Sequence, residues 1–76
     1  MENSLISIKE GAEATVISLT GGLPFQSRLR TMGIREGKLL KVVAIHPFAG
    51  PIVVEVDGRE VTLGRGIAQR IMVEVK

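Results

Sequence analysis

Few side chains in this 76-residue sequence belong to the types that carry out nucleophilic or acid–base chemistry. The chain contains one histidine, His46, and no cysteine, and no serine stands beside a plausible base. Covalent catalysis requires an activated nucleophile and a group that takes its proton. His46 precedes Pro47 at the end of an expected strand, which favours a histidine at the rim of the fold. The sequence therefore predicts a protein that is not an enzyme, with no catalytic residue.

Metal and nucleotide chemistry have equally little support in the residue pattern. Glu55 and Glu60 are expected to face each other across a hairpin, but two exposed carboxylates without a histidine make only a weak cation site. We interpret them as solvated surface charges and assign no metal ligand. The glycines of "GGL" and "GRG" lack the spaced Gly-Lys-Ser/Thr signature of a phosphate-binding loop. We expect no cofactor.

Charge and hydropathy restrict the environment of the chain. The formal net charge is only +2, although the sequence pI is near 9.5, so the surplus of cations is small. The apolar residues occur in runs far shorter than the roughly 20 that a membrane-spanning helix needs. The start "MENSLISIKEG" lacks the basic and long apolar segments of a secretory signal. We expect a cytoplasmic protein that does not insert into a membrane.

The length of the chain permits one small domain, residues 1–76. A domain of this size buries only about 60% of its unfolded surface, and without cysteine no disulfide adds stability. A closed hydrogen-bonded ladder of strands supplies that stability best, which favours a small barrel.

Alternating apolar residues and glycine turns predict five strands. The most secure unit is the hairpin "PIVVEVDGREVTLG", 51–64, where a two-residue Asp57-Gly58 loop pairs Val54 with Val61 and sets Glu55 opposite Glu60. The other strands are expected at 13–20, 37–46 and 70–76, with 37–46 strongly bent so that it serves two parts of the barrel wall. A short helix is predicted at 24–33, ending at Gly33, and one helical turn at 63–71.

The order of these segments resembles the FeoA family. The resemblance rests on "EGAEATV", "RLRTMGI", "REGKLLKVV", "GPIVVEVDGREVTLGRGIA" and "IMVEV", and it runs from about Leu5 to Val75. It implies an SH3-like barrel and a role beside FeoB, the membrane transporter with a GTPase domain that imports Fe(II). A related module forms the C-terminal domain of some metal-dependent repressors, and the start at Met1 favours the stand-alone form.

The basic and apolar residues of the helix suggest where a protein partner docks. Phe25 and Phe48 lie in expected loops, where each either caps the core or forms a contact patch. If Leu23 and Phe25 are exposed, they form an apolar tip beside arginines, a composition typical of binding hot spots. The predicted partner-binding residues are Leu23, Phe25, Arg28, Arg30, Arg35 and Phe48.

Two other functions remain open from the residues. A small barrel that binds nucleic acid would explain the basic stretch from Arg28 to Lys41, but without Tyr or Trp its affinity would rest on charge alone. A detached effector domain of a metal-dependent repressor would bind the other domains of that repressor. The sequence also leaves open a weak homo-oligomer formed through an open barrel edge, and direct binding of Fe(II).

Overall fold

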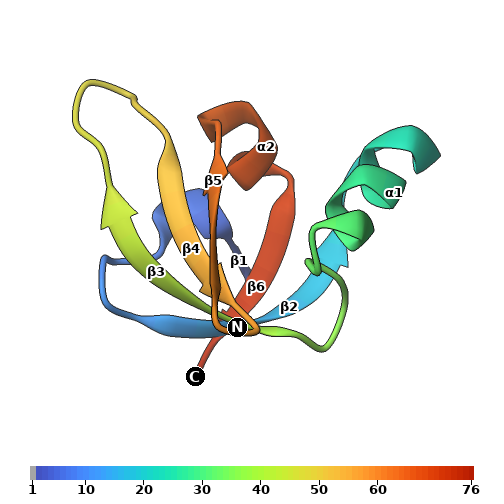
Figure 1. Ribbon diagram of the computed structural model, residues 1–76, viewed down its shortest axis with the longest axis horizontal. Coiled ribbons are helices and arrows are strands. Elements are labelled where there is room, and N and C mark those ends of the chain that lie inside the picture. Colours follow the sequence, from blue (N-terminus) through green and yellow to red (C-terminus); the bar gives the residue numbers. More distant parts are fainter. Residues whose placement is uncertain (1) are drawn as a thin grey trace.

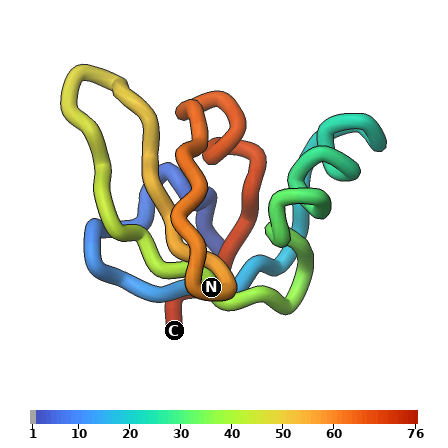
Figure 2. The backbone as a smooth tube through the Cα atoms, viewed as in Figure 1, coloured from blue at the N-terminus to red at the C-terminus, as the bar shows by residue number. Residues whose placement is uncertain are grey.

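The computed structural model describes residues 2–76 and shows a strongly curved antiparallel sheet around one apolar core (Figure 1). The strands follow the order β1-β6-β2-β3-β4-β5 across the sheet. Their bounds are β1 Glu2–Ser4, β2 Glu13–Leu19, β3 Leu39–Ile45, β4 Ile52–Val56, β5 Arg59–Leu63 and β6 Ile71–Val75. The tube in Figure 2 shows how these strands wrap around the core. The mainly β, barrel-like fold predicted from the sequence is confirmed.

The predicted count of five strands is wrong, because residues 2–76 contain six. The additional strand is β1, which pairs with β6 and places Asn3 opposite Val73. A 3-10 helix, η1 (Leu5–Ser7), follows it. The three residues of β1 show no apolar alternation, so no sequence pattern predicted this strand. Its position depends instead on long-range contacts, among them the Ser4 hydroxyl, which donates a 2.9 Å hydrogen bond to the Gln69 carbonyl.

The predicted hairpin between β4 and β5 is confirmed in both turn and register. Asp57 and Gly58 have φ angles of 52° and 77°, the left-handed values that a type I′ turn requires. Val54 pairs with Val61, and Glu55 stands opposite Glu60.

The predicted bend in the third strand is confirmed as well. The register between β3 and β4 shifts between Val42 and Ala44, and a second shift lies in β2 between Val16 and Ser18. Such irregularities increase the local twist and let a small sheet close around its core.

The helix α1 (Leu23–Thr31) ends in a Schellman motif that anchors it to the core. The Gly33 N–H donates to the Arg30 carbonyl at 3.0 Å, and the Ile34 N–H donates to the Leu29 carbonyl at 2.9 Å. Gly33 has a φ of 90°, which its lack of a Cβ permits. Leu29 and Ile34 are fully buried on either side of this turn. The predicted helix end at Gly33 is therefore confirmed.

The second predicted helical segment is also present, as α2 (Arg65–Gln69). Ala68 is fully buried in it, and Ile71 follows into the core at the start of β6. Neither α1 nor α2, the α-helices among residues 2–76, has the length and apolar character that crossing a bilayer requires.

We expect Leu5→Ala to destabilise the protein strongly, because this side chain is fully buried although the sequence pattern did not place it in the core. Truncation of a buried leucine typically costs about 2–5 kcal/mol, a large part of the stability of a small domain. Urea unfolding followed by circular dichroism measures the loss. Leu23→Ala, at a side chain that is 77% exposed, is the matched control and should change stability by less than about 0.5 kcal/mol. Equal effects of the two substitutions would contradict the placement of η1.

Candidate partner-binding surface

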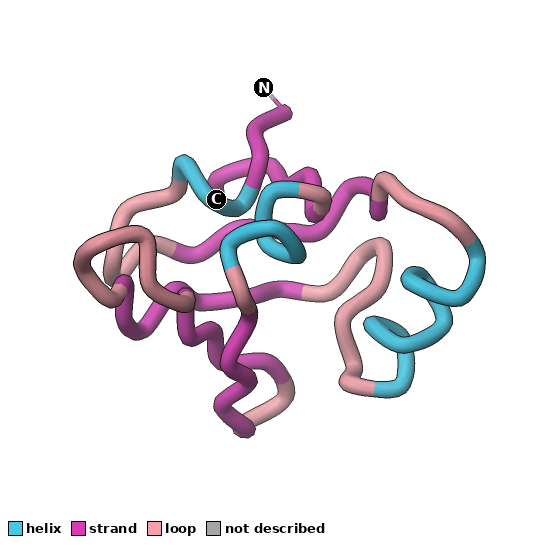
Figure 3. The backbone as a smooth tube through the Cα atoms, turned by 90° about the horizontal axis from the view of Figure 1, so that it is seen from above, coloured by secondary structure: helices cyan, strands magenta, loops and turns pink. Residues whose placement is uncertain are grey.

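The helix α1 stands at one side of the molecule, away from the strands of the sheet (Figures 1 and 3). Only Leu29 is fully buried in it, while Phe25 is partly buried against the core. Leu23 and Arg30 are seven residues apart, so they share one face of the helix, with Ser27 between them. That face is opposite the one that carries Phe25 and Leu29. We call Leu23, Ser27 and Arg30 the outer face of α1.

Phe25 lies in α1 and not in the loop that the sequence predicted, because the helix begins at Leu23, and its ring packs against the core of the barrel. A Cβ added at Gly21 would come within 2.7 Å of the ring, so the ring packs directly over that glycine. The Arg70 guanidinium lies 5.3 Å from the ring centroid, a cation–π contact from the residue after α2. Of the two readings of Phe25, core cap and exposed contact, the structure supports the first. The expected apolar tip of Leu23 together with Phe25 is not formed.

The predicted arginines differ in how far they are engaged. Arg30 forms an ion pair with Glu36 at 3.2 Å and donates to the Gln26 side chain at 3.3 Å. Arg28 and Arg35 are exposed, and no hydrogen bond or ion pair holds either side chain within residues 2–76. The basic charge available to a partner near α1 therefore comes first from Arg28 and Arg35.

Phe48 lies on a different surface from α1. It is 99% exposed in the turn between β3 and β4, and this turn is on the other side of the molecule from α1 in Figures 1 and 3. Phe48 and Ala49 both have positive φ angles, 59° and 58°, and the Gly50 N–H donates to the Pro47 carbonyl at 3.1 Å. The six predicted partner-binding residues therefore do not form one continuous surface. The exposure of Phe48 rules out the reading of this residue as a core cap.

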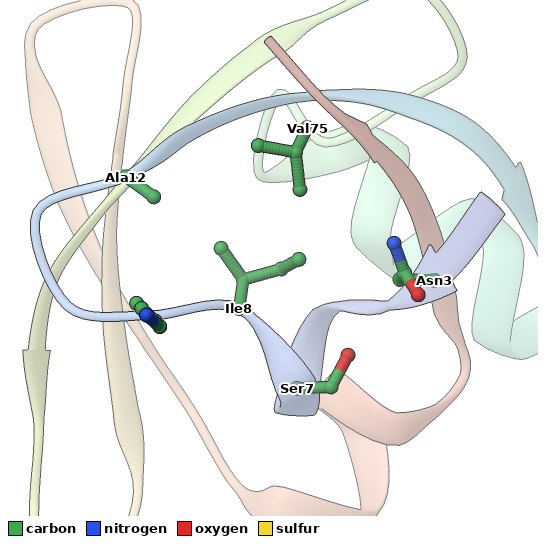
Figure 4. Close-up of a pocket in the computed structure, with 6 residues that line it drawn as sticks. Asn3, Ser7, Ile8, Ala12 and Val75 are labelled. Carbon is green, nitrogen blue, oxygen red and sulfur yellow. The ribbon is translucent and has the colours of Figure 1, made fainter. Parts of the chain in front are cut away.

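A groove of about 390 Å³ lies where the N-terminal segment meets the end of β6 (Figure 4). Ile8, Ala12 and Val75 point into it, so much of its wall is apolar. Its lining residues are Asn3, Ser7, Ile8, Lys9, Ala12 and Val75. The sequence reasoning missed this groove, because it depends on β1 and η1 lying beside the end of β6. Only the turn "KEGA" after η1 hinted at a boundary there.

Metal-binding geometry is absent from the part of the chain that the structure describes. No group of three or more histidine, cysteine, aspartate or glutamate side chains is placed to hold an ion among residues 2–76. Glu55 and Glu60 are paired across the hairpin as expected, and both are exposed. His46 is exposed directly after β3, at the rim position that the sequence predicted.

Comparisons with known proteins place this architecture in a defined class. A crystal structure described as the iron uptake regulatory protein FeoA is 32% identical and superposes with a TM-score of 0.92, with both chains covered over 100% of their length. A manganese-dependent transcriptional repressor in complex with manganese is 30% identical with a TM-score of 0.91, but the match covers 37% of that chain and 99% of this one. The class is therefore a small SH3-like barrel that occurs both alone and as a part of larger repressors.

The chain belongs to the FeoA domain family, whose family model matches residues 3–75. A relative described as putative Fe(2+) transport protein A, from Methanocaldococcus jannaschii, is 41% identical over 66 residues, 87% of this chain and 78% of the relative. The resemblance found in the sequence is confirmed. Membership places the chain in a family of accessory proteins of ferrous iron transport.

We expect Arg30→Gln to raise the pKa of Glu36. A backbone hydrogen bond at Glu36 is the main cause that holds the pKa of this carboxyl below its usual value; desolvation opposes it, and the charge and hydrogen bond of Arg30 lower the pKa further. A lowered pKa means that the charged form adds stability above the unfolded-state pKa, and this contribution is lost as the pH falls through the folded-state pKa. Arg30→Gln should make that acid loss smaller. Titration of the Glu36 carboxyl carbon by NMR measures the pKa, which should stay unchanged in the control Arg28→Gln.

Proposed function

We propose that this protein is a non-enzymatic regulator of Fe(II) uptake that docks, through the outer face of α1, on the cytosolic GTPase-bearing part of a FeoB-type transporter. The single observation that carries the proposal is the exposure of the outer face of α1. The helix is held on the barrel by its inner side, and it presents Leu23 to solvent at 77% exposure. Family membership supplies the iron-transport context.

The outer face of α1 offers a partner one strongly exposed apolar side chain, Leu23. Burial of an exposed leucine in a partner's groove is worth about 1.5–3 kcal/mol, enough to make it a hot spot. Amphipathic helices commonly bind by laying one face into a groove of this kind. Arg28 and Arg35, which no acidic side chain engages within the described chain, favour a partner surface that carries carboxylates. Such charges mainly accelerate association and make it sensitive to salt.

The positions of the remaining cations argue against nucleic acid as the main partner. Lys38 is paired with Asp57 at 2.9 Å, Arg30 is paired with Glu36, and the Arg70 guanidinium lies over the ring of Phe25. Single-strand binders usually add several stacking aromatic side chains to a basic groove. Phe48 is the one strongly exposed aromatic side chain in residues 2–76, and it lies across the molecule from α1.

We expect Leu23→Asp to weaken capture of the transporter's cytosolic domain at least tenfold, since it places a charge where an apolar side chain would be buried. Arg28→Glu should slow association and reduce its dependence on salt. Surface plasmon resonance with the purified cytosolic domain measures both effects. GTP turnover by that domain, with and without this protein, then shows whether docking changes the nucleotide cycle.

The matched control is Phe48→Asp, which makes the same kind of change at an even more exposed apolar residue on the other side of the barrel. It should bind like the wild type. Wild-type affinity for Leu23→Asp in a protein that keeps its fold would reject the outer face of α1. Selective loss in Phe48→Asp would move the docking site to the turn between β3 and β4.

The repressor-like domain is a second candidate, supported by the similarity to the manganese-dependent repressor over nearly the whole of this chain. In this function the barrel would bind the other domains of such a repressor. Co-purification of the protein with a metal-dependent repressor that lacks its own barrel distinguishes the two functions. Binding there, with none to the transporter, would favour the second.

A further inference from the structure

The strand β5 forms an open edge of the sheet. It is the last strand in the order, and β4 is its one strand neighbour. Among residues 2–76, no strand pairs with β5 on the side away from β4. Exposed edges of this kind can pair with another extended chain, and many proteins block them with charge or short length.

The hydrogen-bond pattern of the hairpin identifies the backbone groups that point outward from this edge. In a two-residue type I′ hairpin the residues that flank the turn, Val56 and Arg59, form a hydrogen-bonded pair, and such pairs recur at every second position. Val54 with Val61 is the next one. The N–H and C=O groups of Glu60 and Thr62 therefore point away from β4. Both residues are exposed, and neither has a hydrogen-bond partner on that side within residues 2–76.

Two unneutralised carboxylates lie beside this edge. Glu55 and Glu60 form a non-hydrogen-bonded pair, in which opposite Cβ atoms are only about 4.5–5.5 Å apart, so their charges repel. No ion pair engages either carboxylate in the described part of the chain.

No nearby cation forms an ion pair with Glu55 or Glu60 in the part of the chain that the structure describes. Lys38 binds Asp57, and Arg59 donates to the Met32 carbonyl at 3.2 Å. Lys41 pairs directly with Glu55 in β3, on the same face of the sheet, so Glu60 is the carboxylate of the pair without a cation in register within residues 2–76. A cation on a segment that pairs with β5 would therefore reduce the repulsion between Glu55 and Glu60.

We propose that the β5 edge binds an extended basic peptide segment of a protein partner by adding it as a further strand. Backbone groups of Glu60 and Thr62 offer four hydrogen bonds to the segment. A Lys or Arg placed opposite Glu60 lies on the same outer face as Glu55 and Glu60, because residues that pair directly share a face. The residue opposite Val61 points to the other face, where Val61 is half-buried, and should be apolar.

The ends of β5 limit how much of a partner strand fits. Arg59 is tied to the end of α1, and α2 begins at Arg65, shortly after Leu63. The open stretch therefore covers about three residues, and the affinity should be modest.

Charge also decides between a basic peptide and a second copy of this chain. An antiparallel β5–β5 contact centred on Val61 would pair Glu60 of each copy with Thr62 of the other. The two Glu60 side chains would then lie diagonally across the junction, within interaction range, with a Glu55 beside each. Four carboxylates would meet at that junction, and each Glu60 would lack a cation in register, since Lys41 stands opposite Glu55. A basic segment avoids this cost.

The test titrates an acetylated and amidated heptapeptide of alternating valine and lysine into the full-length ¹⁵N-labelled protein, followed by amide NMR. The amides of Glu60 and Thr62 should shift, and they should become protected from hydrogen exchange. The same peptide with glutamate in place of lysine should bind at least tenfold more weakly. Equal affinity for the two peptides, or shifts confined to other residues, would overturn the proposal. Shifts that depend on protein concentration without peptide would show a second copy on the edge and would also overturn it.

Two substitutions separate the backbone contribution from the charge contribution. Thr62→Pro removes an outward N–H that the ladder does not use and should abolish binding, whereas Thr62→Ala keeps this N–H and should bind as the wild type does. Glu60→Lys leaves the backbone unchanged and should lower the affinity for the lysine peptide at least tenfold, so the test does not depend on the proline variant being folded. Wild-type affinity in a folded Thr62→Pro protein, or in Glu60→Lys, would refute the edge as the site. The site is independent of the outer face of α1, so Leu23→Asp should leave peptide binding unchanged.

Discussion

The burial of apolar side chains inside a nearly closed antiparallel sheet holds this structure together. No polar or charged side chain is fully buried among residues 2–76, so the interior contains no polar network that would hold it together. The chain has no cysteine that would restrain it either. Stability must then come from the hydrophobic effect and from the backbone hydrogen bonds of the wall. Leu5, Leu29, Ile34 and Ile71 lie outside the hairpin of β4 and β5 and are fully buried in the same core.

Because the interior of the barrel is wholly apolar, we place both binding sites on its outer surface. The Schellman turn fixes Leu29 and Ile34 in the core, and it sets the direction in which α1 leaves the barrel. Phe25 and Leu29 form the side of the helix that packs on the barrel, and Leu23, on the opposite side, remains exposed to solvent. The strand β5 also has an uncovered side. It is the last strand of the sheet, so the backbone groups on its outer edge are exposed. Both proposed sites are surfaces that the packing of the barrel leaves exposed.

The two proposed sites differ in the physical basis of their specificity. On the outer face of α1, affinity would come from burial of an apolar side chain, and charge would act mainly on the rate of association. At the β5 edge, affinity would come from backbone hydrogen bonds, and the repulsion between Glu55 and Glu60 would select a basic partner. A protein of 76 residues thus has room for two independent contacts, provided that they lie on separate elements.

Features that follow from local chemistry could be predicted before the fold was known. Alternation and the Asp57-Gly58 turn predicted the hairpin with its register, and Gly33 predicted the end of the helix, because both depend on neighbouring residues. The family was also visible in the order of motifs. The features that depend on contacts between distant segments became visible only in the folded chain. Tertiary structure added β1, whose residues have no strand signal of their own, it turned Phe25 inward onto Gly21 and Arg70, and it separated Phe48 from α1. Exposure is set by what packs against a side chain, and in a barrel those neighbours come from the far end of the chain.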